Sequence, residues 1–222
     1  MRTPFSPLQF ILFIFVIGFL IAFIQIGLLT IAFDKLGLSQ SSAYLLLFGS
    51  LFGSGINLPL FKMNAEHPTH NTLPPTFRSM LRLPPMPFTG KTIVAVNVGG
   101  CLIPLAFSLY LITHNTLPLW QILLAVGLVA TISRLTSRPI QGLGIGMPIF
   151  IAPISAALIA IFLSHNQSPP LAYISGTLGV LLGADILRLN DIRKMGVPIA
   201  SIGGAGTFDG IFITGIVAVL LA

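Results

Sequence analysis

Long apolar runs, separated by short polar or proline- and glycine-containing stretches, make up most of this chain of 222 residues. The runs fall at residues 8–33, 42–61, 92–113, 117–133, 143–164, 171–189 and 201–222. Most are close to the ~20 residues that a helix needs to cross the hydrocarbon layer of a bilayer. The pattern therefore predicts an all-α fold, a polytopic bundle of about seven transmembrane helices.

A single domain, residues 1–222, holds all of these runs, and one long loop at residues 62–91 separates the second run from the third. Six of the 17 prolines lie in this loop, and proline-rich segments favour extended conformations. We expect a cytoplasmic loop there and no separate soluble domain.

The composition also indicates that the chain is surrounded by lipid. Hydrophobic residues make up 55% of the chain and charged residues 7%, whereas soluble domains carry about 25% charged residues. The mean hydropathy is +0.98. These values predict an integral membrane protein whose main partner is the lipid bilayer. Basic loops at one membrane face explain the formal net charge of +6, so the charge does not indicate nucleic-acid binding.

The basic residues also predict an orientation. If the N-terminus lies inside, ten of the 11 lysines and arginines fall in inner segments, and only Lys35 falls in an outer one. Cytoplasmic loops of membrane proteins carry such an excess of basic residues. We therefore expect a multi-pass protein of the cell inner (cytoplasmic) membrane, with the N-terminus inside and the C-terminus outside.

Two aspartates, Asp185 and Asp209, lie inside the last two apolar runs. A carboxylate in hydrocarbon costs at least ~2.5 kcal/mol on insertion scales, so such a residue suggests a function. On helices, Asp185 would lie about 5–8 Å and Asp209 about 9 Å from the inner boundary. Two carboxylates that share a site of low dielectric tend to hold one proton between them. Asp185 and Asp209 are therefore the predicted catalytic residues.

A glycine-rich stretch, residues 201–207, opens the last predicted span. Each glycine costs about 1 kcal/mol relative to alanine in a helix, so we expect an opened turn whose amides can bind an anion or a carbonyl. Asn97 precedes two glycines in the third span, where it either hydrogen-bonds between helices or lines the same cavity. The predicted binding residues are Asn97, Gly203, Gly204, Gly206 and Gly210.

The two aspartates can also be explained by structural roles, without any catalytic function. Asp185 can pair with Arg188 three residues later, and Asp209 can cap the loosened turn at residues 203–206. We expect Asp191 to be a solvated residue of an inner loop.

The sequence predicts no metal and no cofactor. The only cysteine, Cys101, lies in an apolar run, where we expect it to pack as a small side chain. The order Glu-His-Pro-Thr-His at residues 66–70 departs from the zinc-protease helix motif, and Pro68 prevents both histidines from sharing one helical face. The sequence contains no nucleotide-binding loop, haem motif or cysteine cluster.

Three segments carry a resemblance to a known family: residues 96–100 (VNVGG), 183–185 (GAD) and 201–215 (SIGGAGTFDGIFITG). There the chain resembles prokaryotic multi-pass membrane proteins grouped as a domain of unknown function, and the likeness runs from Phe88 to Ala222. That family implies a membrane location and no established activity. The chain also resembles intramembrane aspartyl proteases, the presenilin, signal-peptide-peptidase and prepilin-peptidase group. This resemblance implies one aspartate on each of two neighbouring spans, at Asp185 and Asp209.

Three functions follow from these residues. The first is aspartyl-protease-like hydrolysis of a membrane peptide, with Asp185 and Asp209 alternating as acid and base. The second is a proton-coupled transporter or permease component, in which the acids couple protons and the turn at residues 203–206 binds a small solute. The third is a non-catalytic membrane assembly protein, which would tolerate replacement of both aspartates by asparagine.

Overall fold

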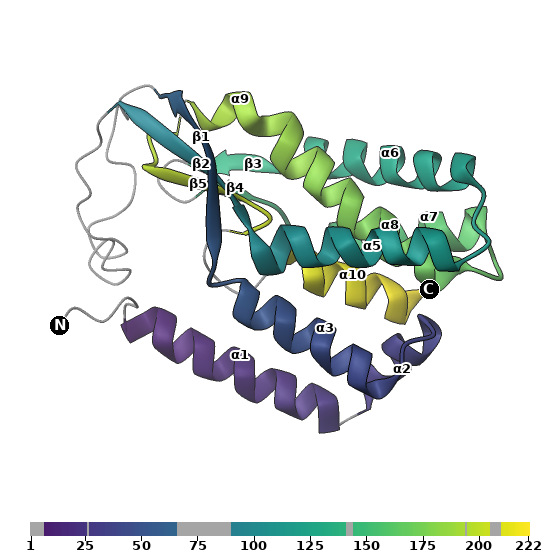
Figure 1. Cartoon of the computed structure of the whole chain (residues 1–222). Coiled ribbons are helices and arrows are strands. Elements are labelled where there is room, and N and C mark those ends of the chain that lie inside the picture. The colour runs from purple at the N-terminus through teal and green to yellow at the C-terminus, as the bar shows by residue number, and fades with distance from the viewer. Residues whose placement is uncertain (1–6, 26, 66–89, 141–143, 194, 205–209) are drawn as a thin grey trace.

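A computed structural model describes residues 7–25, 27–65, 90–140, 144–193, 195–204 and 210–222 (Figure 1). The fold is mostly helical. Its helices are α1 (Pro7–Gln25), α2 (Leu28–Lys35), α3 (Gln40–Gly53), α5 (Ile103–His114), α6 (Leu119–Thr136), α7 (Ile151–Leu163), α8 (Ser168–Val180), α9 (Leu189–Ile192) and α10 (Gly210–Leu221). Two π-helical turns, η1 (Val98–Leu102) and η2 (Leu181–Asp185), and the 3-10 turn η3 (Ile186–Arg188) adjoin these helices.

Two small sheets accompany the helices. Strands β1 (Asn57–Asn64), β2 (Lys91–Asn97) and β5 (Ile199–Ile202) form the larger sheet in the order β1-β2-β5. In this sheet β1 pairs antiparallel with β2, and β5 pairs parallel with β2. Strands β3 (Arg138–Ile140) and β4 (Gly144–Gly146) form an antiparallel pair.

The strands lie at one end of the helical bundle, called here the strand end (Figure 1). The opposite end, the turn end, holds short connections at residues 36–39, 115–118 and 164–167. Helices α3, α6 and α8 run toward the strand end, and each is followed by a strand. Helices α5, α7 and α10 run back from it, and each follows a strand. The long helices after α2 therefore alternate in direction, and the short α9 continues the direction of α8.

Helix α8 lies in the middle of the bundle and packs against α5, α6, α7 and α10. Its Tyr173 and Ile174 are fully buried, and the ring of Phe107 meets Tyr173 edge-on with centroids 4.9 Å apart. Gly183 lets α6 approach closely, because a Cβ atom at this position would lie 2.1 Å from the carbonyl oxygen of Ala130. Small residues bring helices together in this way. The buried side chains of α8 and the close approach of α6 show that α8 forms the core of the bundle.

Strands replace the ends of several predicted helices, so the all-α prediction is wrong at these places. Residues 57–61, 92–97 and 201–202 belong to the larger sheet, and residues 144–146 to the smaller one. Short apolar runs rich in β-branched residues fit a strand as well as a buried helix, and periodicity alone does not separate the two. The first predicted helix is also divided, because Gly27 adopts a left-handed conformation with φ 75° between α1 and α2.

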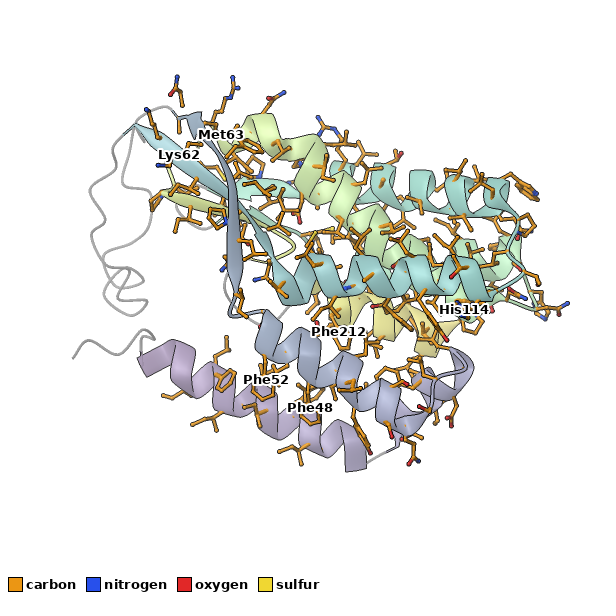
Figure 2. The ribbon with its side chains drawn as sticks, in the orientation of Figure 1. Phe48, Phe52, Lys62, Met63, His114 and Phe212 are labelled. Carbon is orange, nitrogen blue, oxygen red and sulfur yellow. The ribbon has the colours of Figure 1, made fainter. Side chains whose placement is uncertain are left out.

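Two helices in the described part of the chain are long and apolar enough to cross a membrane, Leu119–Thr136 and Ser168–Ile192. In the Leu119–Thr136 window only 28% of the residues are buried, and in the second 72% are. Large apolar side chains cover the outer surface of the bundle, including Leu123, which is 64% exposed, and Phe162, which is 88% exposed. Figure 2 draws side chains around the helices and labels two further exposed ones, Phe48 and Phe52 of α3.

The charged side chains are distributed unequally between the two ends. Seven of the 11 lysines and arginines are described, and only Lys35 of these lies at the turn end. Its ammonium group lies 3.4 Å from the carbonyl oxygens of Val219 and Leu220 at the end of α10. Figure 2 shows Lys62 at the strand end and His114 at the turn end. The remaining described cations are Lys91, Arg134, Arg138, Arg188 and Arg193, all at the strand end.

Candidate functional site

Asp185 lies where the long helix of residues 168–192 loses its regular α-helical geometry. Helix α8 passes into the π-helical turn η2, which ends at Asp185, and then into the 3-10 turn η3. Such π-helical turns occur frequently at functional sites. The close contact of Gly183 with the backbone of Ala130 holds this stretch against α6. The Asp185 carboxylate is thereby carried, half-buried, to the strand end of the bundle.

The carboxylate contacts the backbone of the turn that follows β5. Oδ2 of Asp185 accepts a hydrogen bond of 2.7 Å from the backbone N–H of Gly203. A hydrogen bond to an ionised carboxylate is stronger than one between neutral groups. The contact joins residues 18 positions apart, and so it ties the interrupted helix to the start of the last predicted span.

Two physical constraints favour glycine at position 203. Its φ of 84° lies in the left-handed region, where a side chain is strained. A Cβ atom at this position would also lie 2.7 Å from the backbone nitrogen of Cys101. The predicted opening of the glycine-rich stretch is therefore present at Gly203, where β5 ends and the chain turns. The expected bare amide, however, is occupied by Asp185.

Asn97 lies at the end of β2 and uses its whole amide group within the protein. Its Nδ2 donates to the carbonyl oxygen of Ser54 at 2.7 Å and to Oδ1 of Asn57 at 3.1 Å. Its Oδ1 accepts from the N–H of Gly100 at 2.8 Å and so caps η1. The sequence placed Asn97 inside a helical span, whereas the structure places it at the end of β2, where it hydrogen-bonds to the cap of α3, to β1 and to η1.

The Asn97 network extends to the third strand of the sheet. The hydroxyl group of Ser201 on β5 donates to the same Oδ1 of Asn57, at 2.5 Å. Gly204 lies against this network, since a Cβ atom there would be 3.4 Å from Cγ of Asn97. Side chains from all three strands therefore hold the turn that presents Gly203 to Asp185.

We expect Asn97→Ala to lower the free energy of unfolding by about 2–4 kcal/mol. The change removes three hydrogen bonds and leaves the buried N–H of Gly100 without this acceptor and the half-buried carbonyl oxygen of Ser54 without this donor. Chemical denaturation of the purified protein measures the loss. Asn115→Ala is the matched control, because Asn115 makes one side-chain hydrogen bond, to Leu111 at the turn end. Equal losses for the two variants would contradict the role of Asn97.

The structure brings together the predicted residues Asp185, Gly203, Gly204 and Asn97 at the strand end. Gly210 is the first residue of α10, and nothing within 4 Å would meet a Cβ atom there. Asp209 and Gly206 lie outside the described residues. The pairing of Asp185 with Asp209 thus stays a prediction.

Arg188 forms a polar cluster beside this site that the sequence did not indicate. Its guanidinium group donates to Oδ2 of Asp191 at 3.0 Å, to the hydroxyl group of Ser137 at 2.7 Å, and to the carbonyl oxygens of Arg134 and Ser137, both at 2.5 Å. Arg134 in turn donates to the carbonyl oxygen of Leu187. The cluster joins the end of α6 to the turn η3, and Asp191, expected in solvent, is Arg188's ion-pair partner.

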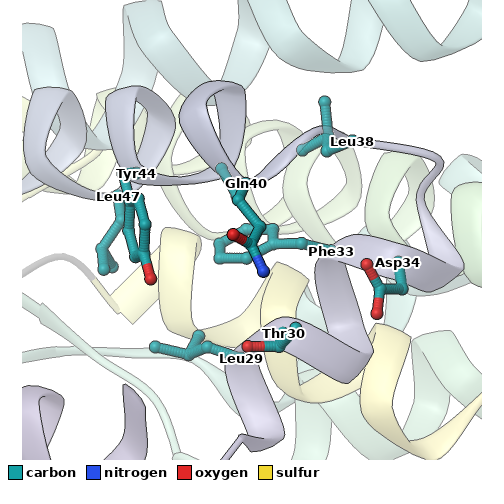
Figure 3. Close-up of a pocket in the computed structure, with 9 residues that line it drawn as sticks. Leu29, Thr30, Phe33, Asp34, Leu38, Gln40, Tyr44 and Leu47 are labelled. Atoms are coloured by element: carbon teal, nitrogen blue, oxygen red, sulfur yellow. The ribbon is translucent and has the colours of Figure 1, made fainter. Parts of the chain in front are cut away.

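A shallow groove lies elsewhere, between α2 and α3 (Figure 3). The buried side chains of Leu29, Phe33 and Leu47 form its apolar floor, and the exposed Asp34 and Gln40 lie at its edge. The groove is at the turn end, so it contains none of the predicted site residues. Within the described ranges no group of three or more His, Cys, Asp or Glu side chains could hold a metal ion. The segment 66–70 lies outside those ranges.

The protein is a mostly helical bundle. It has two long apolar helices and an aspartate at the point where one of them is interrupted. Residues 51–221 match the family model described as protein of unknown function (DUF1614), and the chain belongs to this family. No curated protein and no solved structure matches the chain. The comparisons therefore support the first resemblance, to a domain of unknown function, and give no support to the resemblance to aspartyl proteases.

Proposed function

We propose that this chain is a multi-pass protein of the inner membrane that crosses the bilayer about seven times. The two long apolar helices and the alternating direction of the helices after α2 support this proposal. In this arrangement the strand end faces the cytoplasm, because six of the seven described lysines and arginines lie there.

Within the membrane, we propose a proton-coupled transporter or permease component. The observation that carries this proposal is the 2.7 Å hydrogen bond between Asp185 and the backbone of Gly203. Transporters commonly place their coupling residues where membrane helices are interrupted, since the opened backbone there can bind an ion or a solute. Here the carboxylate sits on the interrupted helix, and the turn before α10 supplies the opened backbone.

Protonation of Asp185 offers a mechanism for coupling. An ionised carboxylate accepts the Gly203 N–H in a charge-assisted hydrogen bond, which weakens when the carboxyl group is neutral. Proton binding would then release the turn from the interrupted helix, and loss of the proton would restore the contact. A small polar solute could bind to the freed N–H of Gly203. The released and bound turns would correspond to two states of the transporter.

Peptide hydrolysis is not favoured by any described contact. It requires a second carboxylate beside Asp185, and the predicted partner, Asp209, lies outside the described residues. The distance between the two carboxylates in an experimental structure would decide that hypothesis.

Electrical measurements on proteoliposomes test the transport proposal. Proteoliposomes adsorbed on a solid-supported membrane would be given neutral amino acids, sugars, carboxylates and amines in turn, at matched pH. We expect a transient current with at least one class for the wild-type protein and none for Asp185→Asn, because asparagine cannot carry the proton. Asp191→Asn is the control, since Asp191 pairs with Arg188. Unchanged currents for Asp185→Asn would disprove the role of the carboxylate.

A further inference from the structure

Strand β1 is an edge strand with apolar side chains exposed on both of its faces. Among the described strands it pairs only with β2, and seven of its eight residues are exposed. Leu58 is 44% exposed, Leu60 58% and Phe61 48%. Successive residues of a strand point to opposite faces, and residues 57–62 are all exposed, so neither face of this part of β1 is covered by the described parts of the bundle. Met63, farther along the strand, packs against the core. An apolar edge strand of this kind needs a covering surface, because in water it would promote aggregation.

The surroundings of β1 are positively charged. Lys62 follows the apolar residues on the strand itself, and Lys91 lies opposite Asn64 in the ladder. Arg138 and Arg193 add two exposed cations at the same end. The described acids near them are already engaged, since Asp191 pairs with Arg188 and Asp185 accepts from Gly203. A covering surface that is both apolar and anionic would complement this end of the molecule.

The lengths of the helices place the sheet close to the boundary of the hydrocarbon layer. Helix α10 has 12 residues and α7 has 13, so they are about 18 and 20 Å long. The hydrocarbon core of a bilayer is about 30 Å thick. These two helices are shorter than this layer, whereas α6 has 18 residues, is about 27 Å long and nearly spans it. The end of α6 and the strands beyond it at the strand end therefore lie near the level of the headgroups.

The backbone of β1 suits that level. The free edge of a strand carries unpaired N–H and C=O groups, which cannot be satisfied in hydrocarbon but can be satisfied by the water among lipid headgroups. Pro59 removes one donor from the strand, and the pairing register with β2 shifts between Pro59 and Phe61. Irregularities of this kind also hinder pairing with another strand. The edge is thus better suited to a lipid interface than to a second protein strand.

We propose that β1 lies in the headgroup layer of the membrane and binds anionic phospholipid. Leu58, Leu60 and Phe61 contact the upper part of the acyl chains, and Lys62 contacts the phosphate groups. A lysine close to an anionic lipid surface is attracted to that surface electrostatically. The inference rests on the proposed membrane location, and it adds a lipid-binding surface on a part of the chain that was predicted to be a transmembrane helix.

Quenching by brominated lipids tests this surface in the full-length protein. Cys101 is the only cysteine, so Cys101→Ala gives a background for single labels. A polarity-sensitive fluorophore would be attached to Leu60→Cys on β1 or to Leu123→Cys on the exposed apolar side of α6, and both proteins reconstituted into nanodiscs. The lipid would be either phosphatidylcholine alone or an equal mixture with phosphatidylglycerol, brominated near the headgroup or near the chain end.

We expect the label at residue 60 to lose about half of its fluorescence with bromine near the headgroup, and to lose less with bromine near the chain end. Quenching should be stronger in nanodiscs that contain phosphatidylglycerol. Adding Lys62→Glu should remove this preference for anionic lipid, and Lys62→Arg should keep it. The label at residue 123 should be quenched most by bromine near the chain end.

The two labels separate the possible failures. Quenching at residue 123 without quenching at residue 60 would overturn the inference about β1 and leave the membrane location intact. Absence of quenching at both residues would overturn the membrane location as well. Equal quenching at residue 60 in both lipid mixtures would overturn the anionic preference. Efficient oxidative cross-linking of unlabelled Leu60→Cys between protein copies in proteoliposomes would show that a second copy covers β1, which also overturns the inference.

Discussion

Replacing Gly99 with alanine should lower the free energy of unfolding by at least about 3 kcal/mol, because the added methyl group has no space. A Cβ atom at Gly99 would lie 2.0 Å from the carbonyl oxygen of Ser50 and 2.4 Å from the backbone nitrogen of Ser54. Both are backbone atoms of the α3 end and its cap, so no side-chain rotation relieves the overlap. The hydroxyl group of Ser50 also donates to the Gly99 carbonyl oxygen at 2.7 Å.

A thermal unfolding curve of the detergent-solubilised protein would measure this effect. For a chain of this size, a loss of 3 kcal/mol corresponds to a fall in Tm of about 10 °C. Gly127→Ala in α6 is the control, since nothing lies within 4 Å of its Cβ position and alanine is the better helix former by about 1 kcal/mol. A Gly99→Ala protein with the wild-type Tm would show that η1 does not pack on the end of α3 as described.

Replacing Arg188 with alanine should also have a large effect, about 2–4 kcal/mol of unfolding free energy, which is the range expected for Asn97→Ala. The change removes the donor of four hydrogen bonds and leaves Asp191 and the carbonyl oxygens of Arg134 and Ser137 without the guanidinium group. The side chain of Arg188 is 15% exposed and that of Asp191 32%. Water can therefore replace part of the lost interaction, and this keeps the expected loss below that of a fully buried pair.

Chemical denaturation of Arg188→Ala, Arg188→Lys and Arg193→Ala would separate the causes. Lysine can restore the pair with Asp191, but it lacks the planar fork of donors that reaches several oxygens at once. We therefore expect Arg188→Lys to recover less than half of the loss. Arg193 is exposed, so its replacement should change the unfolding free energy by less than about 0.5 kcal/mol. Similar losses for Arg188→Ala and Arg193→Ala would contradict the role of Arg188 as a clamp between α6 and η3.

The middle of the helical bundle could be predicted from the apolar runs alone. The run at residues 117–133 corresponds to α6, Leu119–Thr136, and the run at residues 171–189 lies within the helix Ser168–Ile192. Both runs are long enough to exclude a strand. At the strand end the same reasoning failed, because the apolar residues of β1, β2 and β5 join directly onto helical runs and leave no polar boundary to mark the change.

The sequence singled out some of the residues that meet at the strand end, but it did not predict their contacts. Asp185, Gly203 and Asn97 stood out because a carboxylate, paired glycines and an amide are costly inside apolar segments. Asp185 and Asp191 both lie three residues from Arg188, so spacing could not choose between them. The structure pairs Arg188 with Asp191 and brings the Asp185 carboxylate to the N–H of Gly203. The turns η2 and η3 interrupt the regular helix here, so the two aspartates reach different partners.

By itself, the sequence determined that this protein is mostly helical, apolar and basic at one end, and that Asp185 is exceptional. These properties follow from composition and from the periodicity of apolar residues. Both can be read from a short segment of the chain without knowing what the segment contacts. Only the tertiary structure decided which backbone group meets the Asp185 carboxylate, and that three distant segments meet as a sheet. Such contacts depend on the approach of α6 to Gly183 and of η1 to Gly203, and close approach between segments leaves no signature in the spacing of residues along the chain.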